Sequence, residues 1–103
     1  MKGFVFTGDR EVVILEKPTP QPQPGQVLIR TKTSSICGTD LHIYRQSSES
    51  VASGKHTYSG HEPVGEVVAV GLGVNWPKIG DRVVGYHVFG CGVCKFCQLR
   101  RYK

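Results

Sequence analysis

Three cysteines near the end of the sequence have the spacing of a metal-binding loop. Cys91, Cys94 and Cys97 follow one another with two residues between each pair, and glycines occupy positions 90 and 92. A tight loop with this spacing can direct successive sulfur atoms at one tetrahedral ion. The chemistry predicted first for this segment is therefore zinc binding.

Two alternatives to zinc remain open at this segment. The cysteines could be buried and inert, although such residues are expected within a strand or helix rather than beside glycines. They could also hold an iron–sulfur cluster, but the ferredoxin pattern adds a further cysteine after three residues, where this chain has Arg101. A fourth zinc ligand is not evident, because the nearest imidazole, His87, lies on the other side of the cluster.

A second concentration of polar groups surrounds Cys37. The run Cys37-Gly38-Thr39-Asp40-Leu41-His42 contains a thiol, a hydroxyl, a carboxylate and an imidazole, and Gly60-His61-Glu62 comes later, before a predicted strand. A cysteine and a histidine from separate strand ends form a ligand pair that zinc favours. Each residue alone has an ordinary structural explanation, so the combination carries the prediction.

Short runs of β-branched and aromatic residues predict the framework that positions these side chains. The expected strands are residues 2–6, 11–16, 26–35, 64–70 and 81–89. Residues 7–10 have the composition of a hairpin turn. The proline-rich segment 18–25 is expected to be an extended connector rather than a ligand for an SH3 domain, because strands resume directly after it.

One short helix is expected at residues 39–45, capped by Thr39, and the polar segment 46–59 is expected to be a mobile loop. Strands of this length, separated by glycine and proline, predict a mainly β fold in the form of a compact barrel or sandwich. The 103 residues allow one domain.

Composition indicates a globular protein without an evident nucleic-acid or membrane function. The net charge is +5, but lysine and arginine are scattered along the chain apart from a group at positions 95–103. No signal sequence or bilayer-length apolar run occurs, which predicts a soluble cytoplasmic protein. Neither a GxGxxG turn nor a GxxxxGK loop is present.

Four motifs in order carry a resemblance to a known family. They are Cys37-Gly38-Thr39-Asp40-Leu41-His42, Gly60-His61-Glu62-x-x-Gly65-x-Val67, Gly80-Asp81-Arg82-Val83 and the cysteine cluster. The chain thereby resembles the N-terminal catalytic domain of the zinc-dependent medium-chain alcohol dehydrogenases, with its GroES-like, partly open β-barrel. The sequence around Cys37 is most similar to the polyol and threonine dehydrogenase branch of this family.

The resemblance implies a role for each site residue. Cys37 and His61 would bind the catalytic zinc, with Glu62 as a close neighbour and Asp40 holding the His61 ring. Thr39 and His42 would pass the proton of a small-molecule alcohol to solvent while hydride moves to NAD or NADP. The structural zinc would be bound by Cys91, Cys94 and Cys97.

Several parts of the family pattern do not occur in the 103 residues. These are the third protein ligand of the catalytic zinc, the fourth structural cysteine and the nucleotide-binding Rossmann domain. Residues 1–103 are therefore expected to be a fragment, with residues 91–103 starting a structural-zinc lobe, and the parent enzyme is expected to be a homo-oligomer. The fragment alone should be inactive and bind both zinc ions weakly or not at all. A non-catalytic zinc-binding or GroES-like interaction module is the alternative.

Overall fold

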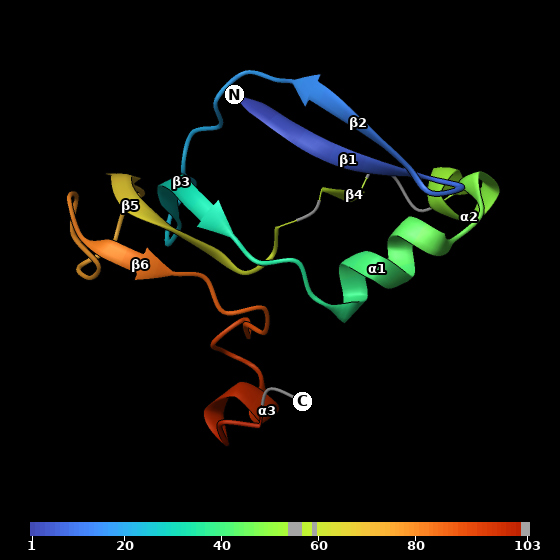
Figure 1. Ribbon diagram of the computed structural model, residues 1–103. Coiled ribbons are helices and arrows are strands. Elements are labelled where there is room, and N and C mark those ends of the chain that lie inside the picture. The colour runs from blue at the N-terminus through green and yellow to red at the C-terminus, as the bar shows by residue number, and fades with distance from the viewer. Residues whose placement is uncertain (54–56, 59, 102–103) are drawn as a thin grey trace.

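The computed structural model describes residues 1–53, 57–58 and 60–101, and its architecture is mainly β (Figure 1). The strands are β1 (Lys2–Gly8), β2 (Glu11–Glu16), β3 (Val27–Ser34), β4 (Thr57–Tyr58), β5 (Pro63–Val70) and β6 (Arg82–Val84). The helices are α1 (Gly38–Arg45), α2 (Ser48–Ser53) and α3 (Lys95–Gln98). The strands form two three-stranded sheets, ordered β2-β1-β4 and β3-β5-β6.

The first sheet is built on the predicted hairpin. Strands β1 and β2 are antiparallel, with Lys2 opposite Glu16 and Phe6 opposite Val12. Asp9 and Arg10 both have positive φ, at 52° and 63°, which is the backbone conformation of a tight hairpin turn. The hairpin prediction is confirmed, and the proline-rich segment after β2 is a connector without regular structure.

The second sheet brings together the two strands that flank the Cys37 and His61 motifs. Strand β3 runs antiparallel to β5, with irregularities in register near Ile29 and Thr33. The strand expected over residues 81–89 is wrong in length, because β6 ends at Val84. At that point the backbone N–H of Gly85 donates to the carbonyl oxygen of Pro63 at 2.7 Å, and the chain then leaves the sheet.

The helices differ from the single short helix that the sequence predicted. Besides α1, the described residues contain the short helices α2 and α3. Segment 46–59, expected to be a mobile loop, contains α2 and β4, while its residues 54–56 and 59 lie outside the described residues. Helix α2 begins there because the Ser47 hydroxyl accepts a hydrogen bond from the backbone N–H of Ser50 and Val51 packs its side chain into the interior.

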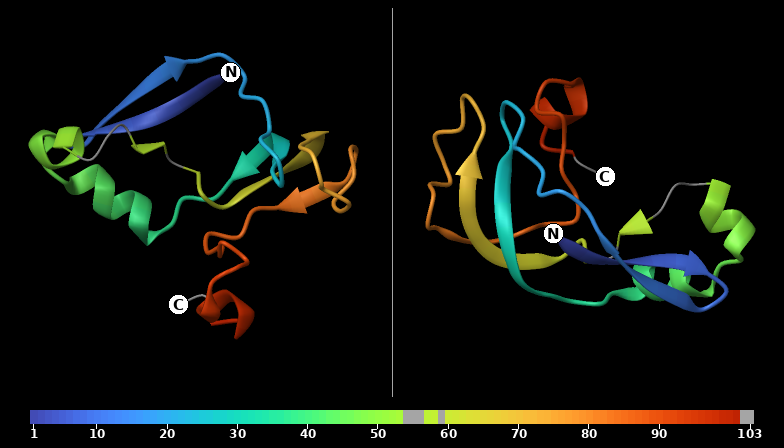
Figure 2. Two further views of the ribbon diagram at one scale, coloured as in Figure 1. Left: turned by 180° about the vertical axis from the view of Figure 1, so that it is seen from behind. Right: turned by 90° about the horizontal axis from the view of Figure 1, so that it is seen from above.

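The two sheets do not close around a common interior. Figure 2 shows β3 and β5 curving into a half-open surface, with the β1–β2 hairpin at one end and the α3 segment extending away from both sheets. The buried hydrophobic residues are Val5, Phe6, Val51 and Val67. This arrangement agrees with the predicted partly open barrel. Within the described ranges, every helix is too short or too polar to cross a bilayer.

Candidate metal centres

Cys37 lies where β3 gives way to α1 and caps that helix. Its Sγ accepts a hydrogen bond from the backbone N–H of Thr39 at 3.3 Å, and its own N–H donates to Asp40 Oδ2 at 2.9 Å. The prediction that Thr39 caps the helix is therefore wrong, because the reciprocal bonds of a capping box are made by Cys37 and Asp40.

His61 faces Cys37 with one ring nitrogen and Asp40 with the other. His61 Nε2 lies 2.9 Å from Cys37 Sγ, and His61 Nδ1 lies 3.7 Å from Asp40 Oδ1. Asp40 is only 1% exposed, so its carboxylate acts on His61 with little screening by solvent. This geometry leaves Nε2 as the nitrogen directed toward the cysteine sulfur.

The donor atoms of this site are compatible with zinc. One ligand atom each from Cys37, His61 and Glu62 lies within 4.8 Å of the others. A thiolate and an imidazole bound to one tetrahedral zinc would stand about 3.6 Å apart, so the 2.9 Å pair would need to open slightly. A soft sulfur, a borderline nitrogen and a carboxylate oxygen are all zinc ligands.

Thr39 and His42 lie on α1 beside this group, and both are exposed. Thr39 approaches Cys37 through its backbone N–H. Among the described residues, neither side chain makes a hydrogen bond to Cys37 or His61. The structure thus places both residues on α1 without connecting their side chains to the donor atoms.

His87 is a neighbour of the site that sequence reasoning missed. Its ring centroid lies 6.4 Å from that of His61, and the Tyr86 ring lies against it at 4.6 Å. The hydrogen bond between Gly85 and Pro63 brings this segment next to the residue that follows Glu62. That contact depends on strand pairing, so no local motif could have indicated it.

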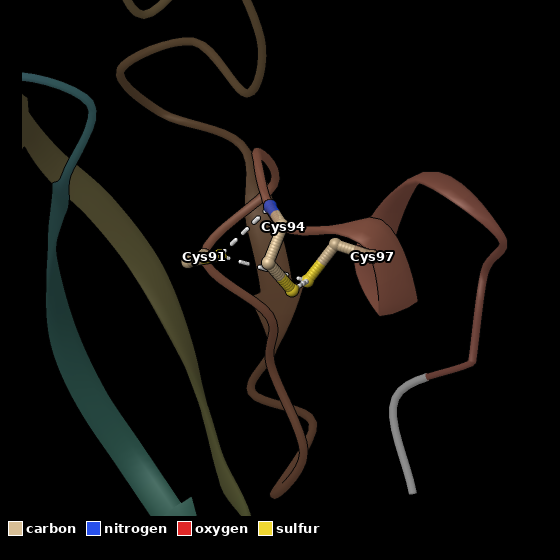
Figure 3. A group of neighbouring side chains, drawn as sticks. All are labelled: Cys91, Cys94 and Cys97. Atoms are coloured by element: carbon tan, nitrogen blue, oxygen red, sulfur yellow. Dashed lines mark hydrogen bonds between the residues drawn. The ribbon is translucent and has the colours of Figure 1, made fainter.

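The cysteine cluster spans the loop before α3 and the helix itself, with Cys94 as its N-cap and Cys97 within it (Figure 3). Cys94 Sγ lies 3.4 Å from Cys97 Sγ, and Cys91 Sγ lies 3.8 Å from Cys97 Sγ. Sulfur ligands of a tetrahedral zinc stand about 3.8 Å apart. The structure therefore brings the predicted sulfur atoms together at a spacing that suits this ion.

Backbone amides favour the ionised form of one of these thiols. The N–H groups of Val93 and Cys94, assisted by the neighbouring thiols, lower the pKa of Cys91 to about 7. The amide of Gly92 also lowers the pKa of Cys97, but the Cys94 thiol, burial and the charge on Cys91 outweigh it and raise that pKa overall. Cys91 is thus partly ionised near neutral pH, and the thiolate is the form that binds metals.

The sequence of this chain matches a known family model over residues 23–103, described as the alcohol dehydrogenase GroES-like domain. The chain belongs to this family. An uncharacterised zinc-type alcohol dehydrogenase-like protein of Escherichia coli is 44% identical over 104 residues, which cover 95% of this chain and 30% of that protein. The L-threonine 3-dehydrogenase of Thermococcus kodakarensis is 44% identical over 91 residues, which cover 86% of this chain and 26% of that protein.

The fold of this GroES-like domain is shared by solved structures. An alcohol dehydrogenase from Thermus sp. ATN1 superposes with a TM-score of 0.83 at 34% identity, covering 99% of this chain and 29% of that chain. Other solved relatives are described as complexes with NADH or NAD. The chain spans 26–30% of the length of the three relatives named here.

Proposed function

We propose that this GroES-like domain supplies the catalytic metal site of a zinc-dependent, NAD(P)-linked alcohol dehydrogenase. The observation that carries the proposal is the approach of His61 Nε2 to Cys37 Sγ, at 2.9 Å, while His61 Nδ1 faces the buried carboxylate of Asp40. An orienting carboxylate behind a metal-facing imidazole is the usual arrangement around ligating histidines.

Cys37 and His61 would hold the ion, with Glu62 as the adjacent donor within 4.8 Å. Bound there, zinc would supply Lewis acidity that makes an alcohol hydroxyl easier to deprotonate. Asp40 would fix the His61 ring through Nδ1 and keep its other nitrogen directed toward Cys37.

Thr39 and His42 would carry the alcohol proton to solvent. Both are exposed on α1, and α1 begins directly after Cys37. A hydroxyl can donate and accept a proton in the same step, and an imidazole can do so near neutral pH. Because neither side chain is hydrogen-bonded to the donor atoms among the described residues, this path would form only when substrate is bound.

Cys91, Cys94 and Cys97 would bind the structural zinc in the lobe that begins at residue 91. The cysteine sulfurs at 3.4 and 3.8 Å support this assignment. The substrate would be a small alcohol, and the similarity to L-threonine 3-dehydrogenase favours a polyol or hydroxy amino acid. We place the parent enzyme in the cytoplasm as a homo-oligomer whose NAD(P) site lies outside residues 1–103.

The test is a chimera in which this domain replaces the matching segment of the Thermococcus kodakarensis threonine dehydrogenase. The chimera should oxidise L-threonine with NAD⁺, and Cys37→Ser should abolish the activity without preventing nucleotide binding. A folded chimera that binds NAD⁺ and has no activity, or one that is unaffected by Cys37→Ser, would refute the proposal. The 103-residue chain alone should show no turnover with any alcohol.

A further inference from the structure

The cysteine cluster holds its sulfur atoms close enough for a second chemistry besides metal binding. Cys94 Sγ and Cys97 Sγ lie 3.4 Å apart and point toward each other, whereas Cys91 Sγ lies 3.8 Å from Cys97 Sγ (Figure 3). A disulfide bond is about 2.05 Å long, so the closer pair needs to approach by only about 1.4 Å.

The backbone conformation also favours a disulfide between Cys94 and Cys97. Cys94 is the N-cap of α3, and Cys97 lies within its single turn, so the two side chains are neighbours on one helical surface. Cys91 lies on the far side of Gly92, whose φ is +78°, and its sulfur is held by the backbone N–H of Cys94 at 3.3 Å.

The pair is also accessible. Cys94 is exposed and Cys97 is partly exposed, and the segment around α3 extends away from both sheets (Figures 1 and 2). Cys37, the remaining cysteine, is engaged with His61 near the start of α1. A small oxidant can therefore reach the Cys94–Cys97 pair without opening the fold.

The geometry points to a peroxide-sensitive switch in which Cys94 and Cys97 alternate between zinc ligation and a mutual disulfide. One thiol releases its proton, and the resulting thiolate attacks hydrogen peroxide; the O–O bond breaks, a sulfenic acid forms, and the leaving hydroxide takes up the released proton to give one water. The second thiol sulfur attacks the sulfenic sulfur; the S–S bond forms, the S–O bond breaks, and a second water leaves. Two thiols lose two electrons, and one peroxide is reduced to two waters.

The two states exclude each other. Disulfide sulfurs carry no thiolate charge and do not ligate zinc as thiolates do. Oxidation therefore removes two of the sulfur donors in this lobe, and a dithiol reductant restores them. This inference rests on the zinc site proposed above for the cysteine cluster, but it does not depend on the proposed dehydrogenase activity.

Peptide mapping can assign the disulfide because trypsin cleaves inside the cluster. Cleavage after Arg82, Lys95 and Arg100 places Cys91 and Cys94 in peptide 83–95 and Cys97 in peptide 96–100. The chain is treated with equimolar hydrogen peroxide, with and without saturating zinc, and digested without reductant. Equilibrium dialysis then compares zinc binding by the reduced and oxidised chains.

We expect the two peptides to be linked in the unmodified chain and in Cys91→Ser, and to be unlinked in Cys94→Ser. Saturating zinc should suppress the linkage, and the oxidised chain should bind one zinc fewer per molecule. Cys37→Ser, a control outside the cluster, should still form the link. A bond within peptide 83–95, a link that survives Cys94→Ser, a disulfide-linked dimer, no disulfide at all, or zinc binding unchanged by oxidation would each overturn the inference.

Discussion

Asp40 connects the start of α1 to the orientation of His61. Its Oδ2 accepts a hydrogen bond from the backbone N–H of Cys37 at 2.9 Å, and its Oδ1 faces His61 Nδ1 at 3.7 Å. The side chain is almost completely buried, and a buried carboxylate is stable only when its oxygens are satisfied. One residue therefore completes the capping box of α1 and also lies against the Nδ1 side of the His61 ring.

Replacing Asp40 should affect both stability and metal binding. Asp40→Ala removes the acceptor for the Cys37 N–H, and we expect a loss of about 1–3 kcal/mol in the free energy of unfolding. Cobalt or zinc affinity at Cys37 and His61 should fall about 10–100-fold because the imidazole loses its orienting partner. Urea unfolding and metal titration measure the two effects.

Asp40→Asn is the matched control for this substitution. The amide oxygen can still accept from Cys37, so Asp40→Asn should recover most of the stability while metal affinity stays reduced. Unchanged metal affinity in Asp40→Ala would show that Asp40 does not position His61.

At the residue scale, the sequence predicted which side chains would lie close together, but not the hydrogen bonds and strand pairing that position them. The types and order of Cys37, His61 and Glu62 were sufficient to predict a shared site. The capping role of the Cys37 sulfur was missed because cysteine is not among the usual N-cap residues. His87 was missed because its position near His61 depends on the pairing of β5 with β6.

Strands β3 and β5 bring the two halves of the candidate site together, and Gly65 permits their close approach. Strand β5 follows His61 and Glu62, while β3 leads toward Cys37. A Cβ at Gly65 would collide with the carbonyl oxygen of Arg30 and would lie 2.6 Å from the Cγ2 atom of Ile29. Any side chain there must push β3 and β5 apart.

Gly65→Ala should therefore lower the free energy of unfolding by about 1–3 kcal/mol, the usual cost of overpacking a close contact. Gly38→Ala is the matched control, because Gly38 has no atom within 4 Å of the added carbon. Alanine is also the better helix former, so this variant should be no less stable than the parent. The denaturant midpoints of unfolding of the two variants, measured under the same conditions, test this prediction. Equal midpoints would show that Gly65 is not needed for the close approach of β3 and β5.

At the element scale, alternating patterns were more informative than polar segments. The β1–β2 hairpin followed directly from its β-branched residues and turn composition. Helix α2 was not predicted within the polar segment because it depends on a serine hydroxyl at its start and on the tertiary burial of Val51. Strand β6 stopped early because the next residue opposite it on β5 is Pro63, which accepts a hydrogen bond from Gly85 but has no N–H to donate in return. The sequence does not reveal this pairing.

The molecule as a whole is more open than its mass would suggest. A compact monomer of this mass exposes about 5,700 Å², whereas this chain exposes 8152 Å². Its radius of gyration is 15.6 Å, compared with about 12.8 Å for a compact domain of the same length. Large apolar side chains are correspondingly exposed, among them Ile14, Leu72, Trp76 and Phe89.

This surface should make the 103-residue chain associate with itself or with hydrophobic dyes. Exposed apolar patches of this kind drive association in proportion to the area that they bury. We expect sedimentation coefficients that rise with protein concentration and enhanced fluorescence of a bound anilinonaphthalene dye. If the chain stays monomeric at every concentration and does not enhance the dye fluorescence, its apolar surface is less exposed than in this structure.

Cobalt(II) titration of the chain tests most directly the claim that Cys37 and His61 form a metal site separate from the cysteine cluster. Cobalt(II) binds the same kinds of site as zinc, and its thiolate-to-metal charge-transfer bands report ligation by sulfur. The sequence alone predicted weak binding of the ions or none, but the donor distances in the structure lead us to predict two ions per chain at saturating cobalt. Cys37→Ser and His61→Ala should each abolish one of them and leave the spectrum of the cysteine cluster intact. Two ions and an unchanged spectrum in both variants would contradict the claim.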